Sequence, residues 1–246
     1  MSTLKVDPES GKQKPDYRWN DEELTEQVYL NHLAGTQSIG VQPCNENSDA
    51  RFGVVDVDPK NYTDFDKKFF IDIIQNYNLP LIPVLSKSGG LHLYLFMSEF
   101  VPAVLIRSFL SNLLPLFKLK PDCEIFPKQT QLTKDNETGQ LNKGNFINLP
   151  YFKKSERVAI NIDGKAFTFD QFIEVVESNT ATPEKLKTIT EGIEQKDLEG
   201  VDAEFDDGPP CLAHLSKIMR NPGFDGKDRF MYNYHVFVKM KYGDNW

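Results

Sequence analysis

The segment Phe52-Gly53-Val54-Val55-Asp56-Val57-Asp58 predicts the centre of the fold. Its apolar part is typical of a buried β-strand, and the two aspartates come where that strand ends. Residues two positions apart on a strand project from the same face, so Asp56 and Asp58 direct their carboxylates toward one point. Two such carboxylates repel each other unless a cation lies between them, and hard oxygen ligands suit Mg²⁺ or Mn²⁺. Because sheets commonly place ligands at strand ends, the segment predicts a metal site there rather than a surface turn.

A second polar segment, Ser86-Lys87-Ser88-Gly89-Gly90-Leu91-His92, lies between two apolar runs that predict strands. A tight turn needs glycine and serine for conformational reasons alone, and the histidine could be an ordinary half-buried strand residue. Beside the paired aspartates we favour a phosphate site, in which backbone N–H groups and the hydroxyls of Ser86 and Ser88 face phosphate oxygens. Lys87 would add charge or remain solvated, and His92 would be a further phosphate contact.

A third acidic group is expected from the segment Pro121-Asp122-Cys123-Glu124-Ile125-Phe126-Pro127-Lys128-Gln129, which again places two acids at i and i+2. Proline ends the predicted strand at Pro127, so Glu124 lies near a strand terminus. We therefore expect Glu124 to be the third metal ligand, with Asp122 as the alternative. Lys128 follows at a point where it could meet a phosphate.

These segments, together with Gly144-Asn145-Phe146-Ile147-Asn148-Leu149-Pro150, resemble the archaeo-eukaryotic primase superfamily. More narrowly, they are similar to the primase–polymerases of phages, plasmids and other mobile elements. The resemblance covers residues 39–152, and four motifs in the same order are far more specific than an Asp-x-Asp pair alone. It implies an α+β fold, with a mixed-sheet, RRM-like catalytic core followed by a small all-α module. It also implies a DNA primase or DNA polymerase, a template-directed nucleotidyltransferase that makes or extends primers on single-stranded DNA.

Residue roles follow from the resemblance, motif by motif. The ligands of two Mg²⁺ or Mn²⁺ ions would be Asp56, Asp58 and Glu124, with Asp122 competing for the third place. The incoming NTP or dNTP would be contacted by Ser88 and His92. From their own chemistry, Ser86, Lys87, Gly89, Gly90 and Lys128 are expected to contact its phosphates as well. Asn145 and Asn148 match a motif that lies near the nucleotide or lines the site. In such a site a 3′-hydroxyl attacks the α-phosphate, while one metal lowers its pKa and the other steadies the leaving pyrophosphate.

Composition and charge fit a folded core with one acidic segment. The 246 residues are 39% apolar and include 18 Phe, enough for a sizeable core. The net charge is −8, but eight acidic residues against one lysine between Glu191 and Asp207 account for −7 of it. The acidic balance therefore describes this segment and says little about the partners of the globular part. Three separated cysteines, Cys44, Cys123 and Cys211, argue against a zinc knuckle and a disulfide framework, and fit a reducing compartment.

Neither a secretory leader nor a membrane span is predicted. Residues 1–20 are polar and charged, and the apolar run Leu79–Leu85 is only as long as a strand. We expect a soluble, cytoplasmic protein of a bacterial or archaeal host cell, encoded by a phage or another mobile element, with no membrane partner.

Periodicity and turn signals predict a catalytic domain at residues 1–180, an acidic linker at 181–207 and a helical module at 208–246. A loosely held arm is expected over residues 1–17. Expected helices span 20–34, 63–78, 102–117 and 169–178, and the module is expected to add 209–219 and 229–242. Expected strands span 38–41, 51–57, 81–85, 91–97, 123–126, 146–150 and 159–162.

The C-terminal module mixes basic and aromatic side chains, which can hold single-stranded nucleic acid by phosphate contact and base stacking. We expect it to contact the template or the initiating nucleotide through Lys217, Arg220, Arg229 and Tyr232. An amphipathic helix pair with an ordinary solvated face is the alternative. The sequence ends within a helical pattern at Trp246, so a helicase, fused after this point or acting in trans, is an expected partner beside template and primer.

Two other functions fit the same acidic residues. They could serve metal-dependent hydrolysis of phosphodiesters, which would degrade DNA without any nucleotide. The domain could also be a non-catalytic nucleic-acid-binding module, but the joint presence of Asp56, Asp58 and Glu124 argues against that reading.

Overall fold

The computed structural model describes residues 4–6, 13–15, 19–20, 24–62, 64–134, 142–153, 155–193, 232, 235–237 and 239–240. The chain divides into two compact units, Met1–Pro183 and Glu184–Trp246. In the second unit, residues 184–193 are helical, as are the described residues between 232 and 240. The helices of the first unit are α1 (Glu26–Ala34), the 3-10 helix η1 (Pro59–Asn61), α2 (Lys67–Asn76), α3 (Ala103–Leu113) and α4 (Phe169–Asn179).

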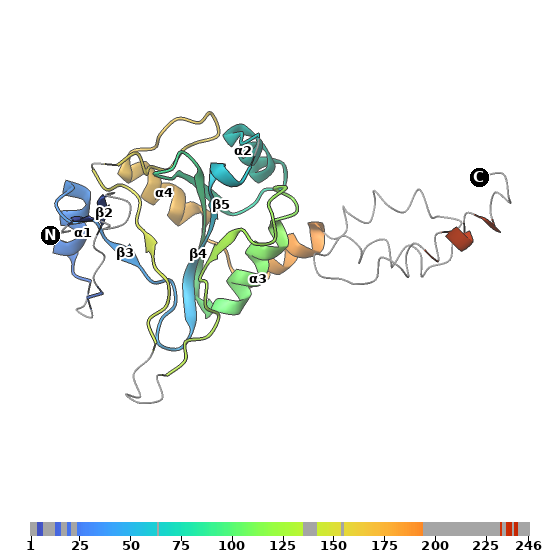
Figure 1. Ribbon diagram of the computed structural model, residues 1–246, viewed down its shortest axis with the longest axis horizontal. Helices are drawn as coiled ribbons and strands as arrows, with labels where there is room; N and C mark the ends of the chain where they lie inside the picture. Colours follow the sequence, from blue (N-terminus) through green and yellow to red (C-terminus); the bar gives the residue numbers. More distant parts are fainter. Residues whose placement is uncertain are drawn as a thin grey trace. The chain divides into compact units, whose positions relative to one another are not determined.

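A four-stranded antiparallel sheet forms the centre of the first unit (Figure 1). Its strands lie in the order β5-β6-β4-β7. Its strands are β4 (Asp49–Val57), β5 (Leu81–Leu85), β6 (Leu91–Pro102) and β7 (Glu124–Phe126). β4 pairs with β6 on one side and β7 on the other, so it lies in the interior of the sheet. Burial on both faces explains the unbroken apolar run at its centre.

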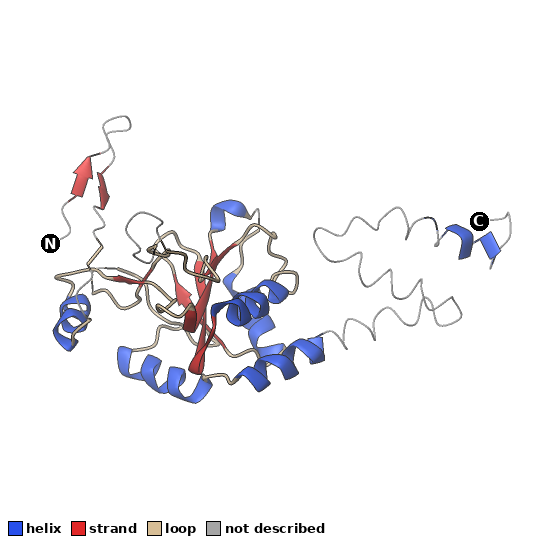
Figure 2. Cartoon of the chain, turned by 90° about the horizontal axis from the view of Figure 1, so that it is seen from below, coloured by secondary structure: helices blue, strands red, loops and turns tan. Residues whose placement is uncertain are grey.

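One face of the sheet packs against α3. A Cβ atom at Gly53 of β4 would collide with the side chain of Ile106, so the glycine lets the helix lie directly on the strand. α2 joins this layer through Phe70, whose ring stacks on that of Phe117 with 5.6 Å between centroids. α3 and α2 therefore lie on this side of the sheet. Figure 2 shows helices packed beside the strands.

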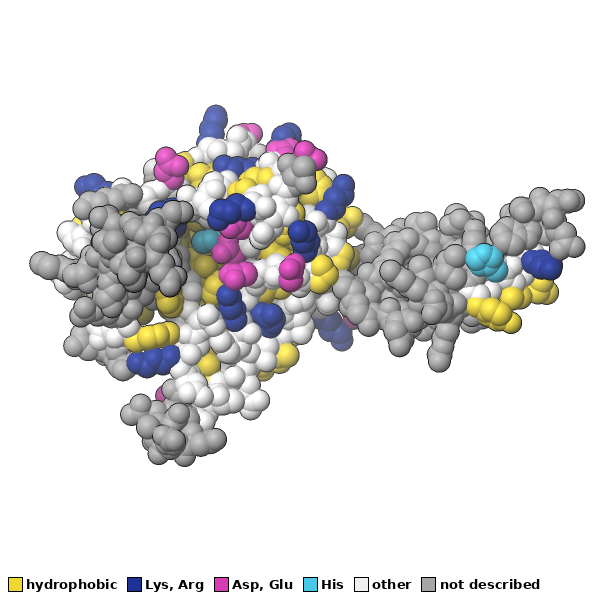
Figure 3. All heavy atoms as spheres, in the orientation of Figure 1, with side chains coloured by type: hydrophobic (Ala, Val, Ile, Leu, Met, Phe, Trp, Pro, Cys, Tyr) yellow, Lys and Arg dark blue, Asp and Glu magenta, His cyan; other side chains and the backbone are white. Residues whose placement is uncertain are grey.

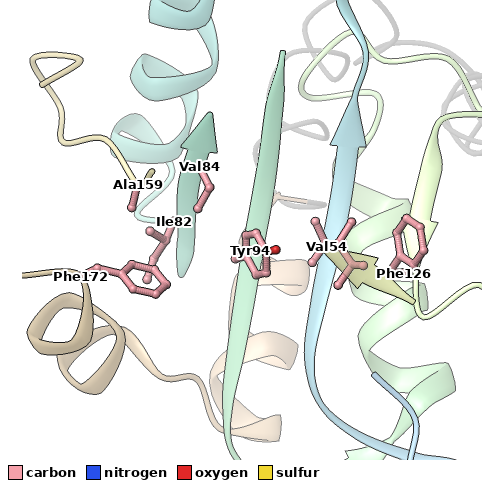
Figure 4. Close-up of a cluster of buried hydrophobic side chains, with 8 residues drawn as sticks. Val54, Ile82, Val84, Tyr94, Phe126, Ala159 and Phe172 are labelled. Atoms are coloured by element: carbon pink, nitrogen blue, oxygen red, sulfur yellow. The ribbon is translucent and has the colours of Figure 1, made fainter. Parts of the chain in front are cut away.

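The other face carries an apolar cluster, which on β4 includes Val54 but not the later residues of the strand. Its members are Val54, Ile82, Val84, Tyr94 and Phe126 on the sheet, with Ile147, Ala159 and Phe172 packed over them. Figure 4 shows the sheet residues on neighbouring strands, with Phe172 reaching them from α4. α4 and α3 thus lie on opposite faces (Figure 1). Beyond Val54, the same face becomes polar.

Smaller pairings extend the sheet and flank it. Residues 158–160 run beside the edge strand β5: Ala159 bridges Val84, and the Leu85 N–H donates to Val158 O at 2.9 Å. β3 (Gly40–Val41) pairs with β8 (Ile147–Asn148), and β1 (Leu4–Val6) pairs with β2 (Gln13–Pro15).

The predicted α+β class is confirmed, and most predicted elements are present within a few residues. β5 has the predicted bounds. β6 runs on to Pro102, past its predicted end at residue 97, because after a bulge its last residues pair with the start of β4. α1 begins at Glu26 rather than near residue 20, with Thr25 at the N-cap. The expected loose arm contains the β1–β2 pair.

The C-terminal predictions are only partly covered by the structure. Residues 183–193 are helical, within the segment predicted to be a linker. The expected helix 209–219 lies outside the described residues, and the expected helix 229–242 is described at a few positions only. The domain limits therefore stay predictions. In the described part of the chain, no helix is both long and apolar enough to cross a membrane.

Candidate active site

Three predicted site residues lie in one row across the sheet. Asp56 of β4 is directly opposite His92 of β6 on one side and Glu124 of β7 on the other. Opposed residues of antiparallel strands project from the same face, so all three belong to the face that carries the apolar cluster. His92 Nε2 lies 3.3 Å from Asp56 Oδ1, and the imidazole is buried. The row therefore begins in the core at His92 and reaches solvent at Glu124, whose side chain is 56% exposed.

Asp58 follows β4 directly and caps η1. Its Oδ1 accepts a hydrogen bond from the Lys60 backbone N–H at 3.2 Å, and its Oδ2 pairs with Lys60 Nζ at 3.0 Å. These contacts with Lys60 hold the pKa of the Asp58 carboxyl below its ordinary value. A second carboxylate charge thus stands at the end of β4, balanced by its own lysine.

Glu124 and Asp122 differ in their relation to the sheet. Glu124 opens β7 and pairs through Oε1 with Lys128 Nζ at 2.9 Å. Asp122 lies in the turn before β7 and is exposed. Of the two candidates for a third acid, Glu124 is therefore the one that the sheet places opposite Asp56.

The predicted phosphate turn joins β5 to β6 and packs against the end of β4. The Gly90 N–H donates to Ser86 Oγ at 3.1 Å, and the Ser86 and Ser88 hydroxyls lie 2.9 Å apart. Gly89 has a φ of 84°, a conformation that costs glycine little. A Cβ at Gly90 would collide with the carbonyl of Val57, so this glycine lets the turn approach the strand that carries the aspartates.

The segments around residues 129 and 145 are joined by a reciprocal amide pair. Gln129 Nε2 donates to Asn145 Oδ1 at 2.6 Å, and the Asn145 N–H donates to Gln129 Oε1 at 3.0 Å. Asn148 lies further along, on β8, where its carbonyl accepts a hydrogen bond from Tyr94 Oη at 3.4 Å. The predicted motif at residues 144–150 thus lies over the same face of the sheet as the row of His92, Asp56 and Glu124, which we call the acidic row.

A family model described as the archaeo-eukaryotic primase domain of TOTE conflict systems matches residues 10–190. The chain belongs to this family. The matched range includes the whole four-stranded sheet and all four motifs, and it confirms the superfamily expected from the sequence. This superfamily is one of primase-like nucleotidyltransferases. Among curated proteins, no sequence matches the chain.

The acids of this primase domain suit a hard divalent cation in their chemistry. In the part of the chain that the structure describes, no three His, Cys, Asp or Glu side chains come close enough to hold a metal ion together. Each carboxylate instead has a basic neighbour: Asp56 has His92, Asp58 has Lys60 and Glu124 has Lys128. Figure 3 shows acidic and basic side chains mixed closely on one face of the first unit. Carboxylates that need their charge balanced are a donor set that Mg²⁺ or Mn²⁺ satisfies, and the three-acid ligand set stays a prediction.

Sequence reasoning missed Arg107, which supports β7 from α3. Its Nη1 donates to Ile125 O at 2.8 Å and to Pro127 O at 2.9 Å. These two bonds tie the backbone between Glu124 and Lys128 to the helix on the opposite face of the sheet. The arginine on the predicted helix offered no local signal, because its partners are carbonyls of a separate strand.

Sequence reasoning also missed Arg157. It lies two residues before Ala159, whose bridge to Val84 puts this segment beside the strand that leads to Ser86. The arginine is buried, with Nε 3.3 Å from Ser155 Oγ. Burial raises the pKa of the Tyr94 phenol. The charge of Arg157 lowers this pKa and the charge of Asp56 raises it. The backbone after Arg157 thus runs beside the strand that leads into the turn, while Arg157 Nη2 lies 3.5 Å from Ser38 Oγ.

The predicted DNA contacts of the C-terminal module mostly lie outside the described residues. Lys217, Arg220 and Arg229 are among these. Tyr232 is described as helical, and it is 72% exposed. Its role, like theirs, stays a prediction.

Proposed function

We propose that this protein is a template-directed nucleotidyltransferase that makes or extends primers on single-stranded DNA. The observation that carries the proposal is the row of His92, Asp56 and Glu124 beside a serine–glycine turn, in a chain of the archaeo-eukaryotic primase family. A phosphate-binding turn and paired carboxylates at one end of β4 would serve the two charged partners of this reaction, the nucleotide triphosphate and the metal.

The carboxylates of Asp56, Asp58 and Glu124 would hold two Mg²⁺ or Mn²⁺ ions, which supply charge that favours the 3′-oxyanion and the leaving pyrophosphate. His92 holds Asp56 from the core side, so the central carboxylate keeps its direction. Lys60, whose side chain is 78% exposed, and Lys128 can turn away from the carboxylates, since their long stems allow it.

The triphosphate would lie against the turn from Ser86 to Gly90. Its backbone N–H groups, the Ser88 hydroxyl and His92 would donate to phosphate oxygens. Lys60 and Lys128, once released from their carboxylates, would add positive charge. Arg157 lies on the segment beside the strand that leads to this turn, and its planar guanidinium would add a group well matched to phosphate.

Primer synthesis and extension on single-stranded DNA test the proposal, with NTPs or dNTPs and either Mg²⁺ or Mn²⁺. The wild-type protein is expected to incorporate nucleotides, and the double variant Asp56→Ala, Asp58→Ala is expected to lose this activity. Asp163→Ala, at an exposed turn, is the matched control and should stay active. Loss of DNA without any nucleotide would indicate a nuclease instead. Tight DNA binding without a nucleotide-dependent product under either metal would indicate a binding module.

A further inference from the structure

An aromatic and cationic cluster lies on residues 19, 143 and 146. The indole of Trp19 meets the ring of Phe146 edge to face, with centroids 6.0 Å apart and planes at 89°. Lys143 Nζ lies 5.5 Å from the centroid of the Trp19 ring. Trp19 remains 48% exposed and Lys143 is exposed. The indole and the lysine are thus both exposed and lie side by side.

Phe146 anchors this cluster to the fold. A Cβ atom at Gly40 of β3 would collide with the Phe146 ring, so the ring lies directly on the backbone of that strand. The next residue, Ile147, is buried and pairs with Val41 in the β3–β8 ladder. The ring that supports Trp19 is therefore held against the β3–β8 pair.

The cluster is connected to the acidic row by a short series of contacts. Asn145, next to Phe146, shares two hydrogen bonds with Gln129. Gln129 follows Lys128, whose Nζ pairs with Glu124 at 2.9 Å. A strand lying on the cluster would therefore be led toward the carboxylates.

We propose that Trp19, Lys143 and Phe146 form a template platform, on which single-stranded DNA stacks a base against Trp19 and places a phosphate near Lys143. An exposed indole beside a cation suits a ligand that presents both a π-face and a negative charge, and a DNA strand presents both at every nucleotide. Stacking tolerates any base, which suits a template that must move past the site. The inference rests on the proposed function, because it assigns the template of that reaction to the side of the site where Gln129 and Asn145 lie.

Tryptophan fluorescence tests the platform directly. The chain has two tryptophans, so Trp246→Phe leaves Trp19 as the sole reporter. Titration of this full-length variant with oligo(dT), without nucleotide or metal, is expected to quench the Trp19 emission and saturate. In an anisotropy assay, Trp19→Ala is expected to weaken oligo(dT) binding about 5- to 100-fold, and Trp19→Phe should retain most of it. Lys143→Ala is expected to lower the salt slope of binding by about 0.7.

Lys118→Ala is the matched control, because Lys118 Nζ also lies over an aromatic ring, 5.2 Å from the centroid of Phe69 of α2. It should change neither affinity nor salt slope. Saturable quenching together with the reduced salt slope of Lys143→Ala would support the platform even if no nucleotide is ever incorporated. The lack of incorporation would then count only against the proposed function. Nucleotide incorporation with unchanged Trp19 emission and unchanged binding by Trp19→Ala would overturn the platform alone. An emission change with a protein partner but not with DNA would overturn it as well.

Discussion

Asp56 of β4 and Glu124 of β7 face each other as directly paired residues on one face of the sheet. Like charges in such a pair repel each other. Here a base stands beside each carboxylate, His92 beside Asp56 and Lys128 beside Glu124. A divalent cation between the two would relieve the same repulsion and free Lys128 for another anion. This pairing is the link between the fold of the chain and the chemistry we propose for it.

The first prediction concerns the third acid. Glu124→Gln removes both the repulsion from Asp56 and the exposed ion pair with Lys128, so the free energy of unfolding should change by less than about 1 kcal/mol. Nucleotide incorporation should fall at least about a hundredfold, since a metal contributes several kcal/mol to such a reaction. Asp122→Asn, in the exposed turn, should keep both the stability and the nucleotide incorporation of the wild type. Full activity in Glu124→Gln, with loss in Asp122→Asn, would reverse the assignment.

The second prediction compares two adjacent glycines of the turn from Ser86 to Gly90. Gly89→Ala meets no atoms but must adopt a positive φ, at a cost of about 1–2 kcal/mol. Gly90→Ala would push the turn away from Val57 O and from Pro59, so it should cost more and should also raise the KM for the nucleotide. Thermal unfolding and steady-state kinetics measure the two effects. An equal KM in both variants would show that the approach of the turn to β4 does not matter for nucleotide binding.

The third prediction concerns the pH dependence of the Asp58–Lys60 pair. Because Lys60 lowers the pKa of Asp58, the pair stabilises the fold above the ordinary carboxyl value of 3.8, and this contribution disappears as the pH falls through the lowered pKa. Lys60→Gln should raise the pKa of Asp58 in a carboxyl NMR titration. It should reduce stability at neutral pH by at most about 1 kcal/mol, with no difference left in strong acid. Lys68→Gln, which breaks an exposed pair with Asp72, should leave the Asp58 titration unchanged.

The fourth prediction assigns Arg107 to the positioning of β7. Arg107→Met leaves the carbonyls of Ile125 and Pro127 without their charged donor, so the fold should lose about 1.5–3 kcal/mol. Mn²⁺ affinity, measured by electron paramagnetic resonance, should fall as well, because Glu124 begins the same strand. Arg51→Met is the matched control: Arg51 also donates to two carbonyls, those of Met97 and Ser98, but on the distant half of β6. Equal loss of Mn²⁺ affinity in both variants would contradict the assignment.

Much of the sheet could be predicted because its strands carry their own signals. Leu81–Leu85 is a short apolar run bounded by turn residues, and its predicted bounds match the structure. β4 could be recognised from the apolar residues that precede Asp56. β6 extends further than predicted because its exposed residues 98–100 interrupt the apolar pattern, while Val101 and Pro102 are held by pairing with Ala50 and Asp49.

The acidic row needed the structure, since register depends on pairing between distant segments. A slip of one residue between β4 and β7 would turn Glu124 to the opposite face, and nothing in its local sequence excludes that. The turn from Ser86 to Gly90 could be recognised by composition, but its approach to β4 depends on the space around Gly90. Arg157 escaped prediction because residues 158–160 reach β5 only through tertiary pairing.

The most direct test of the account is extension of a labelled primer by one nucleotide on single-stranded DNA, comparing the wild-type protein with Asp56→Asn. Asparagine keeps the shape of the side chain and removes the charge at the centre of the row. We predict metal-dependent extension by the wild type and loss of at least about a hundredfold in the variant, with oligonucleotide binding retained. Extension by Asp56→Asn at the wild-type rate would contradict the account.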